Sequence, residues 1–200
     1  MTRNVRRLGG VAGLVLGLWL ASAGTRLAEA ADTDKIKEAS AILSKLAAAI
    51  EKKDAAETKK LVAVLKAKDT DVIMAALGLR SKGGVGWGPK PALTKNIDGI
   101  EVKFEDFGKK PLTAKSFATE AENILKAAHL IQAINEVTIV QAPDKDQGQK
   151  KKKTWVDSAN ELKKAADDLT AAAAKNDMAG TTKAINLVNT ACQKCHSEWR

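Results

Sequence analysis

Residues 162–200 read LKKAADDLTAAAAKNDMAGTTKAINLVNTACQKCHSEWR, and this stretch decides the fold. Alanine, lysine and leucine dominate it, and these residues favour helix over sheet. Asn176-Asp177 is typical of a short turn, so the stretch predicts two helices joined as a hairpin. The second helix carries both cysteines of the chain close to its end.

That second helix contains Cys192-Gln193-Lys194-Cys195-His196. Cys-x-x-Cys-His is the attachment signature of a covalently bound c-type haem. On a helix, Cys195 and His196 follow Cys192 by three and four residues, so the three side chains project from one face. We therefore expect one haem c, bound through Cys192 and Cys195, with His196 as the proximal ligand of the iron.

Two other chemistries use a cysteine pair. A structural zinc ion needs four ligands, and only His129 lies outside the motif among the usual nitrogen and sulfur donors. A dithiol redox pair is favoured at a helix N-terminus, whereas this pair lies near a helix C-terminus, where the dipole opposes thiolate formation. The motif thus favours haem attachment.

The N-terminus has the three parts of an export signal. Residues 11–23 form an apolar stretch, and residues 28–30 read Ala-Glu-Ala, a small-x-small cleavage pattern. The positive region before them consists of Arg3, Arg6 and Arg7. We interpret residues 1–30 as a signal peptide cleaved near Ala30, because the apolar stretch is shorter than the roughly 20 residues of a membrane span. An uncleaved anchor is the alternative.

Cleavage would leave residues 31–200 as a single helical domain in the periplasm, without stable membrane insertion. The whole chain has a formal net charge of +9. A positive field favours encounter with acidic redox partners or a negatively charged membrane surface. A nucleic-acid partner is not expected, because no aromatic residues or recognised binding motif accompany the lysine run at residues 150–153.

Three further helices are predicted upstream of the hairpin. Apolar residues recur at helical spacing over 33–53, over 54–77 with Asp54 as N-cap, and over 113–141, where Pro143 stops the helix. Residues 154–157 resemble a capping box at the start of the hairpin's first helix. The sequence therefore predicts an all-α protein.

Residues 78–111 do not read as helix. Ser81 to Pro91 is rich in glycine and proline, and an amphipathic segment follows over 97–107. We predict a long crossover loop that Trp87 packs onto the helices. A phosphate-binding loop is excluded, because no strand precedes the glycines and no Gly-Lys-Ser/Thr ends them.

Residues 162–200 as a whole resemble the class II c-type cytochromes, the cytochrome c′ and c556 group, in a planctomycete-type layout. The likeness includes the Ala-rich helix, the turn, the terminal haem motif, Trp199 three residues after the histidine, and the basic Arg200. The resemblance implies a four-helix-bundle-like fold with haem near one end and Arg200 near a haem propionate. The N-terminal helical hairpin and the Gly-rich crossover loop are additions to it.

The resemblance implies either a methionine as distal ligand and electron transfer, or an apolar distal site that binds a small gas such as nitric oxide. Met178 cannot reach the iron, because it lies about 27 Å before His196 along one helix. Met74 and His129 remain as candidate distal ligands. An open distal site, with no protein ligand and lined by Leu125 and Ala128, is slightly favoured over either of these ligands.

The expected function is electron transfer by a periplasmic mono-haem cytochrome that is not an enzyme. The alternatives are a five-coordinate haem protein that binds a small gas, and a non-redox helical adaptor. A homodimer is left open.

Overall fold

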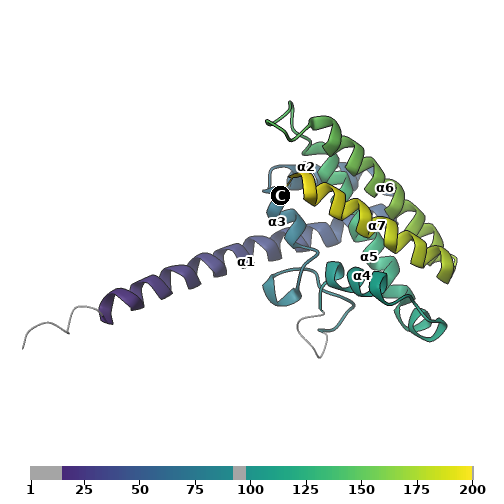
Figure 1. Cartoon of the computed structure of the whole chain (residues 1–200), viewed down its shortest axis with the longest axis horizontal. Coiled ribbons are helices and arrows are strands. Elements are labelled where there is room, and N and C mark those ends of the chain that lie inside the picture. The colour runs from purple at the N-terminus through teal and green to yellow at the C-terminus, as the bar shows by residue number, and fades with distance from the viewer. Residues whose placement is uncertain (1–14, 92–97, 200) are drawn as a thin grey trace, which may run out of the picture.

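The computed structural model describes residues 15–91 and 98–199, with side chains from residue 32 on. Within these ranges the chain forms seven α-helices and one short 3-10 helix, and no strand (Figure 1). No helix in the described part is long and apolar enough to cross a membrane. Residues 1–14 of the predicted signal peptide, and Arg200, lie outside the described residues.

The first two helices form the expected N-terminal hairpin. Helix α1 spans Val15–Glu51 and α2 spans Ala55–Lys66. Between them Lys53 takes a left-handed backbone with φ of 57°, and the Asp54 carboxylate accepts a hydrogen bond from the backbone N–H of Glu57 at 3.0 Å. Asp54 is thus the N-cap that the sequence predicts. Helix α1 also extends toward the N-terminus beyond the predicted start and runs through Ala30.

The prediction of a single helix over 54–77 is wrong, because the structure has two helices in this range. Helix α2 ends at Lys66, and α3 spans only Thr70–Ala75. The Asp69 carboxylate starts α3 by accepting from the N–H of Asp71 at 3.1 Å. The Gln141 side chain donates to the Lys68 carbonyl at 2.8 Å. A residue far along the chain thus provides the hydrogen bond for a carbonyl that the break between the helices leaves without a helical partner.

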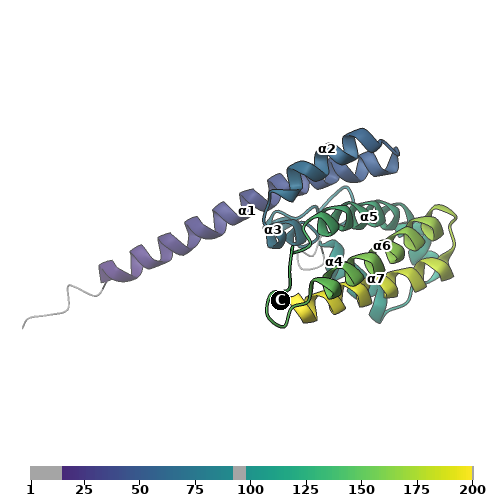
Figure 2. The same cartoon turned by 90° about the horizontal axis from the view of Figure 1, so that it is seen from above.

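Helices α5 (Ala114–Val140), α6 (Lys152–Ala174) and α7 (Met178–Trp199) form the bundle. They agree closely with the predicted ranges. The capping box predicted at residues 154–157 does not form, because α6 already begins at Lys152, whose N–H is bound by the Asp146 carboxylate at 2.9 Å. In Figure 2, α5 lies between the α1–α2 hairpin on one side and α6 and α7 on the other.

The core follows from this layering, since the buried apolar side chains of α5 face both layers. Ile124, Ile131, Ile134 and Val137 on α5 are at most 2% exposed. Leu43 and Leu46 reach the core from α1, and Leu169 and Ile185 from α6 and α7. The fold is therefore the all-α, four-helix-bundle-like arrangement predicted, with an additional N-terminal hairpin.

The crossover contains a helix that the sequence analysis did not predict. Helix α4 spans Ile100–Lys109 and packs against α7. Its buried residues Ile100, Phe104 and Phe107 recur at helical spacing. The glycines and prolines that precede α4 correctly indicate the loop, but they give no information on the secondary structure of the segment after it.

The loop itself is held by a partly buried polar network. Arg80 Nε donates to an Asp98 carboxylate oxygen at 3.0 Å, and the other Asp98 oxygen accepts from the N–H of Trp87. Trp87 Nε1 donates to Glu120 of α5 at 2.8 Å, and its ring meets Phe104 and Phe107 edge-on. Trp87 thus packs the loop onto the helices as predicted. Gly86, with φ of 78°, leaves the space that the Arg80 guanidinium fills.

Candidate functional site

A cleft opens where α7 meets α3, α4, α5 and α6. Its volume is about 80 Å³, and its walls are mainly apolar. The apolar wall consists of Met74, Leu77, Ile100, Phe104, Ile131, Ile134, Leu162 and Val188. An apolar cleft with few polar groups is the common form of a cofactor site.

Helix α7 brings the haem motif to this cleft. Cys192 and His196 both line it, and they lie one helical turn apart. Asn189, one turn further back, donates its side-chain N–H to the Phe104 carbonyl of α4 at 2.8 Å. Gly108 permits this close approach, because a Cβ there would lie 3.0 Å from the Asn189 side-chain nitrogen.

Burial governs the chemistry of the two thiols. It raises the pKa of Cys192 to about 12, with smaller contributions from the negative charge of Glu101 and from Cys195. Burial also raises the pKa of Cys195. Both residues are therefore neutral thiols at neutral pH in the chain alone, unlike the low-pKa thiolate of a dithiol redox pair.

The residues present fit a haem. The Cys192 thiol and the His196 imidazole line the apolar cleft. Cys195 is not among the lining residues, but it follows Cys192 by three residues on the same helix, the spacing that covalent attachment requires. In the described ranges no group of three or more His, Cys, Asp or Glu side chains could hold a metal ion by itself. A porphyrin supplies four ligands of its own, so one protein histidine suffices to add an axial ligand.

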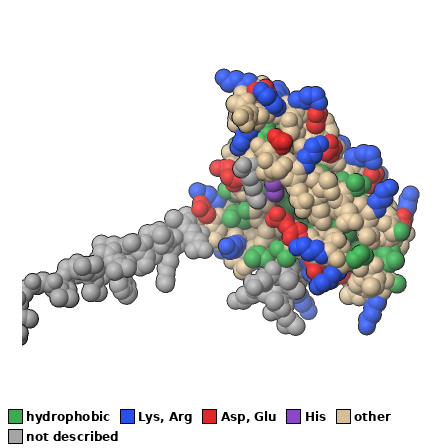
Figure 3. All heavy atoms as spheres, in the orientation of Figure 1, with side chains coloured by type: hydrophobic (Ala, Val, Ile, Leu, Met, Phe, Trp, Pro, Cys, Tyr) green, Lys and Arg blue, Asp and Glu red, His purple; other side chains and the backbone are tan. Residues whose placement is uncertain are grey.

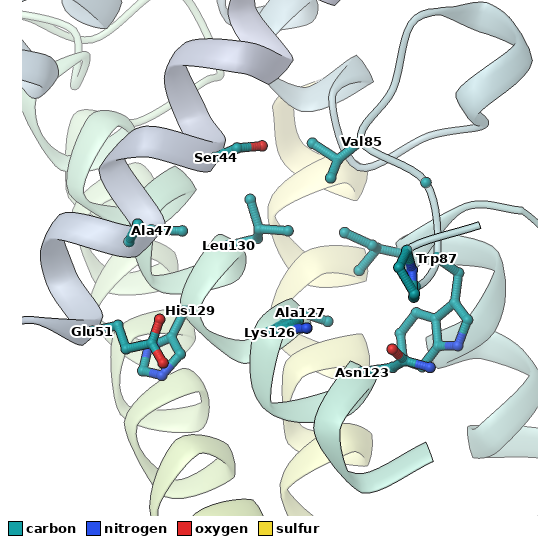
Figure 4. A pocket seen from close by; sticks show the side chains of 15 residues that line it. Ser44, Ala47, Glu51, Val85, Trp87, Asn123, Lys126, Ala127, His129 and Leu130 are labelled. Atoms are coloured by element: carbon teal, nitrogen blue, oxygen red, sulfur yellow. The ribbon is translucent and has the colours of Figure 1, made fainter. Parts of the chain in front are cut away.

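The two candidate distal ligands lie in different places. Met74, half-buried at the end of α3, lines the same cleft as His196. His129 lines a second cavity of about 250 Å³ between α1, the crossover loop and α5, shown in Figure 4. The structure therefore brings Met74, but not His129, to the cleft of the haem motif.

His129 has its own surroundings in the second cavity. One ring nitrogen, Nδ1, is 3.0 Å from the side-chain oxygen of Gln132, and Gln132 donates in turn to Asp167 of α6. In Figure 4, Glu51 of α1 lies beside His129 at one end of the cavity, and Trp87 and Asn123 lie toward the other. Of the residues that the structure describes, Ile100 alone lines both cavities.

The residues expected to line an open distal site are elsewhere. Ala128 is fully buried in the helical core, and Leu125 packs against that core half-buried. Neither lines the cleft. The periodicity of α5 identifies its buried face correctly, but periodicity does not show which neighbouring helix covers each part of that face.

Helix α4 supplies cleft residues that sequence reasoning missed. Phe104 forms part of the apolar wall, while Glu101 and Glu105 bring two carboxylates to the cleft. The signal was present in the amphipathic segment over 97–107, whose apolar positions have helical spacing.

Comparison with known proteins agrees with this geometry. The model of the family described as cytochrome c′ matches residues 93–200, which include α4 to α7 and the haem motif. No curated protein and no solved structure matches the chain. Helices α1 to α3 precede the matched residues, so Met74 comes from outside them. Because the match covers more than half of the chain and includes the whole haem motif, this protein belongs to the cytochrome c′ family of haem-binding cytochromes.

Proposed function

We propose that this protein is a mono-haem c-type cytochrome that carries electrons in the periplasm. The observation that carries the proposal is that Cys192 and His196 of the single Cys-x-x-Cys-His motif line one apolar cleft. A bound haem would supply one-electron chemistry at its iron. The two thiols would hold it covalently, so that it stays in place in both oxidation states.

The cleft residues would tune that chemistry. Phe104, Ile131 and Ile134 would exclude water from a bound cofactor, and a low-polarity environment disfavours the more highly charged oxidised iron. Glu101 and Glu105 act in the opposite direction, because their negative charges favour the oxidised form. The potential should depend on the balance between these two groups.

In this proposal Met74 would supply the second protein ligand of the iron. It is the methionine whose side chain lines the cleft, and it comes from α3 rather than from the helix that carries His196. A thioether opposite a histidine gives a low-spin haem and raises its potential. Low-spin haem with two protein ligands is suited to electron transfer, because neither ligand need leave when the electron moves.

Gas binding is the second candidate function. The observation in its favour is that the residues that α5 and α6 bring to the cleft, Ile131, Ile134 and Leu162, are all aliphatic. If the Met74 sulfur does not bind the iron, the distal position is open and apolar, and a small gas such as nitric oxide would be its natural ligand.

The location and the partners extend the proposal. The arginines, the apolar stretch and the Ala-Glu-Ala sequence at the N-terminus support export to the periplasm, and the net charge supports an acidic redox partner. Figure 3 shows acidic side chains between the basic ones on the face it displays. Exposed pairs such as Lys151 with Asp146 neutralise part of the lysine run, so the electrostatic attraction should be moderate.

Optical spectra of the purified holoprotein test the proposal. Oxidised, reduced and carbon monoxide-treated samples should show a covalently bound low-spin haem that takes up carbon monoxide slowly, because Met74 must leave first. A high-spin haem that binds carbon monoxide at once would favour gas binding. A protein without any haem absorbance after maturation in a competent host would contradict both functions.

A further inference from the structure

The indole of Trp199, at the end of α7, has a buried hydrogen-bond donor without an acceptor. Its Nε1 is out of contact with solvent and has no hydrogen-bond partner among the described residues. Its ring packs edge-on against Trp155 of α6, with the centroids 4.9 Å apart. The Trp155 indole N–H, by contrast, donates to the Thr138 carbonyl at 2.8 Å. Buried polar groups are normally paired, so the Trp199 N–H needs an acceptor.

A positive charge lies against the same indole. Lys150 Nζ donates to the Trp199 carbonyl at 3.0 Å and is 5.9 Å from the centroid of its ring. Its neighbours Lys151 and Lys153 form ion pairs with Asp146 and Asp157. No carboxylate of the described chain lies within 4 Å of the Lys150 ammonium. The indole N–H and the ammonium would both be satisfied by one anionic acceptor.

The position of Trp199 indicates where that acceptor would come from. Trp199 follows His196 by three residues and Cys195 by four, so it lies on the helix face that carries the haem motif. Neither Trp199 nor Lys150 lines the cleft itself, so the two residues would meet a cofactor bound to His196 at its edge. The acid groups of a haem are its two propionates, and each presents a carboxylate at the edge of the ring.

We propose that one haem propionate accepts a hydrogen bond from Trp199 Nε1 and is neutralised by Lys150. This inference rests on the proposed haem site and adds two residues to it. Trp199 would orient the propionate by its fixed N–H, and Lys150 would offset its charge. Both effects withdraw negative charge from the edge of the haem, so both favour the reduced iron.

Trp199→Phe in the holoprotein tests the proposal, because it keeps an aromatic ring and removes only the N–H and the larger indole. The resonance Raman band of propionate bending should shift, and the reduction potential at pH 7 should fall. Trp155→Phe is the matched control. It removes an indole N–H from the same ring pair, but one that is bound to Thr138, and it should leave the propionate band in place.

Lys150→Met provides the second variant and should also lower the potential and shift the band. If Trp199→Phe yields no folded holoprotein, Lys150→Met alone tests whether a propionate binds at this position. A haem-containing protein whose propionate band is unchanged in Trp199→Phe and in Lys150→Met would overturn this inference alone. A shift in Lys150→Met without one in Trp199→Phe would overturn the role of Trp199. Absence of covalent haem from the wild-type protein would instead overturn the proposed function.

Discussion

Met74 and His196 line the same cleft, one from the short helix α3 and the other from the last turns of the C-terminal helix α7. Sequence distance therefore gives no indication that the two residues share a site. The relationship depends on the break after Lys66, which separates α3 from α2, and on α4, which packs against α7 beside the cleft.

The first prediction concerns the sixth ligand of the iron. Met74→Ala should change the haem from low spin to high spin, erase the near-infrared charge-transfer band of a thioether ligand and lower the potential, because the second axial ligand is lost. Optical and near-infrared spectra measure all of these changes except the potential, which requires a redox titration.

His129→Ala is the matched control, since His129 lines the other cavity and not the cleft. Its spectrum should remain that of the wild type. A low-spin wild-type spectrum that becomes high-spin in His129→Ala, but not in Met74→Ala, would show that the ligand assignment is wrong.

The second prediction follows from the Cys192 thiol in the chain without haem. Its pKa is about 12 in the folded state because of burial, against an ordinary value of 9.0. Below pH 9 the thiol is protonated in both states, so it does not alter stability. Between pH 9 and pH 12 the unfolded chain loses the proton and the folded chain keeps it, so the free energy of unfolding should fall by about 1.4 kcal/mol per pH unit.

Denaturant unfolding at pH 8 and pH 10 measures this effect. The difference between the wild type and Cys192→Ser isolates the thiol from the lysines, which titrate in the same range in both proteins. Equal losses of stability in the two proteins between these pH values would rule out a buried neutral thiol at Cys192.

The third prediction concerns the crossover loop. Asp98→Ala should destabilise the protein by about 3 kcal/mol, because it leaves the Arg80 guanidinium and the Trp87 N–H without their carboxylate. Guanidinium chloride unfolding provides the measurement. Asp106→Ala is the control, since Asp106 pairs with Lys110 on the surface and its loss should cost less than about 1 kcal/mol. Equal effects would mean that the network does not hold the loop.

The long helices could be predicted from local patterns because their boundaries are local too. Thr113 and Ser116 form the capping box that starts α5, Pro143 follows its end, and Asn176 takes the left-handed turn before α7. The haem motif is likewise a local pattern, since its three residues share a helix face wherever that helix packs.

The distal side could not be predicted for the opposite reason. His129 lies at the border of the buried face of α5, but that face is divided between α1 and the crossover loop on one side and α6 on the other. Helix α4 was not predicted, because its segment follows a Gly-rich loop in the sequence. Phe104 of this helix nevertheless forms part of the cleft wall. Which element covers which face is a property of long-range packing, and one sequence contains no direct record of it.

The central claim is that Cys192 and Cys195 attach a haem that His196 binds in the cleft of α7. Denaturing electrophoresis with haem staining tests it most directly, using protein matured in a host that exports and attaches haem. The account predicts one stained band for the wild type and none for the Cys192→Ala, Cys195→Ala double variant, at equal protein loading. A wild-type protein without the stained band would contradict the account, and so would a double variant that keeps it.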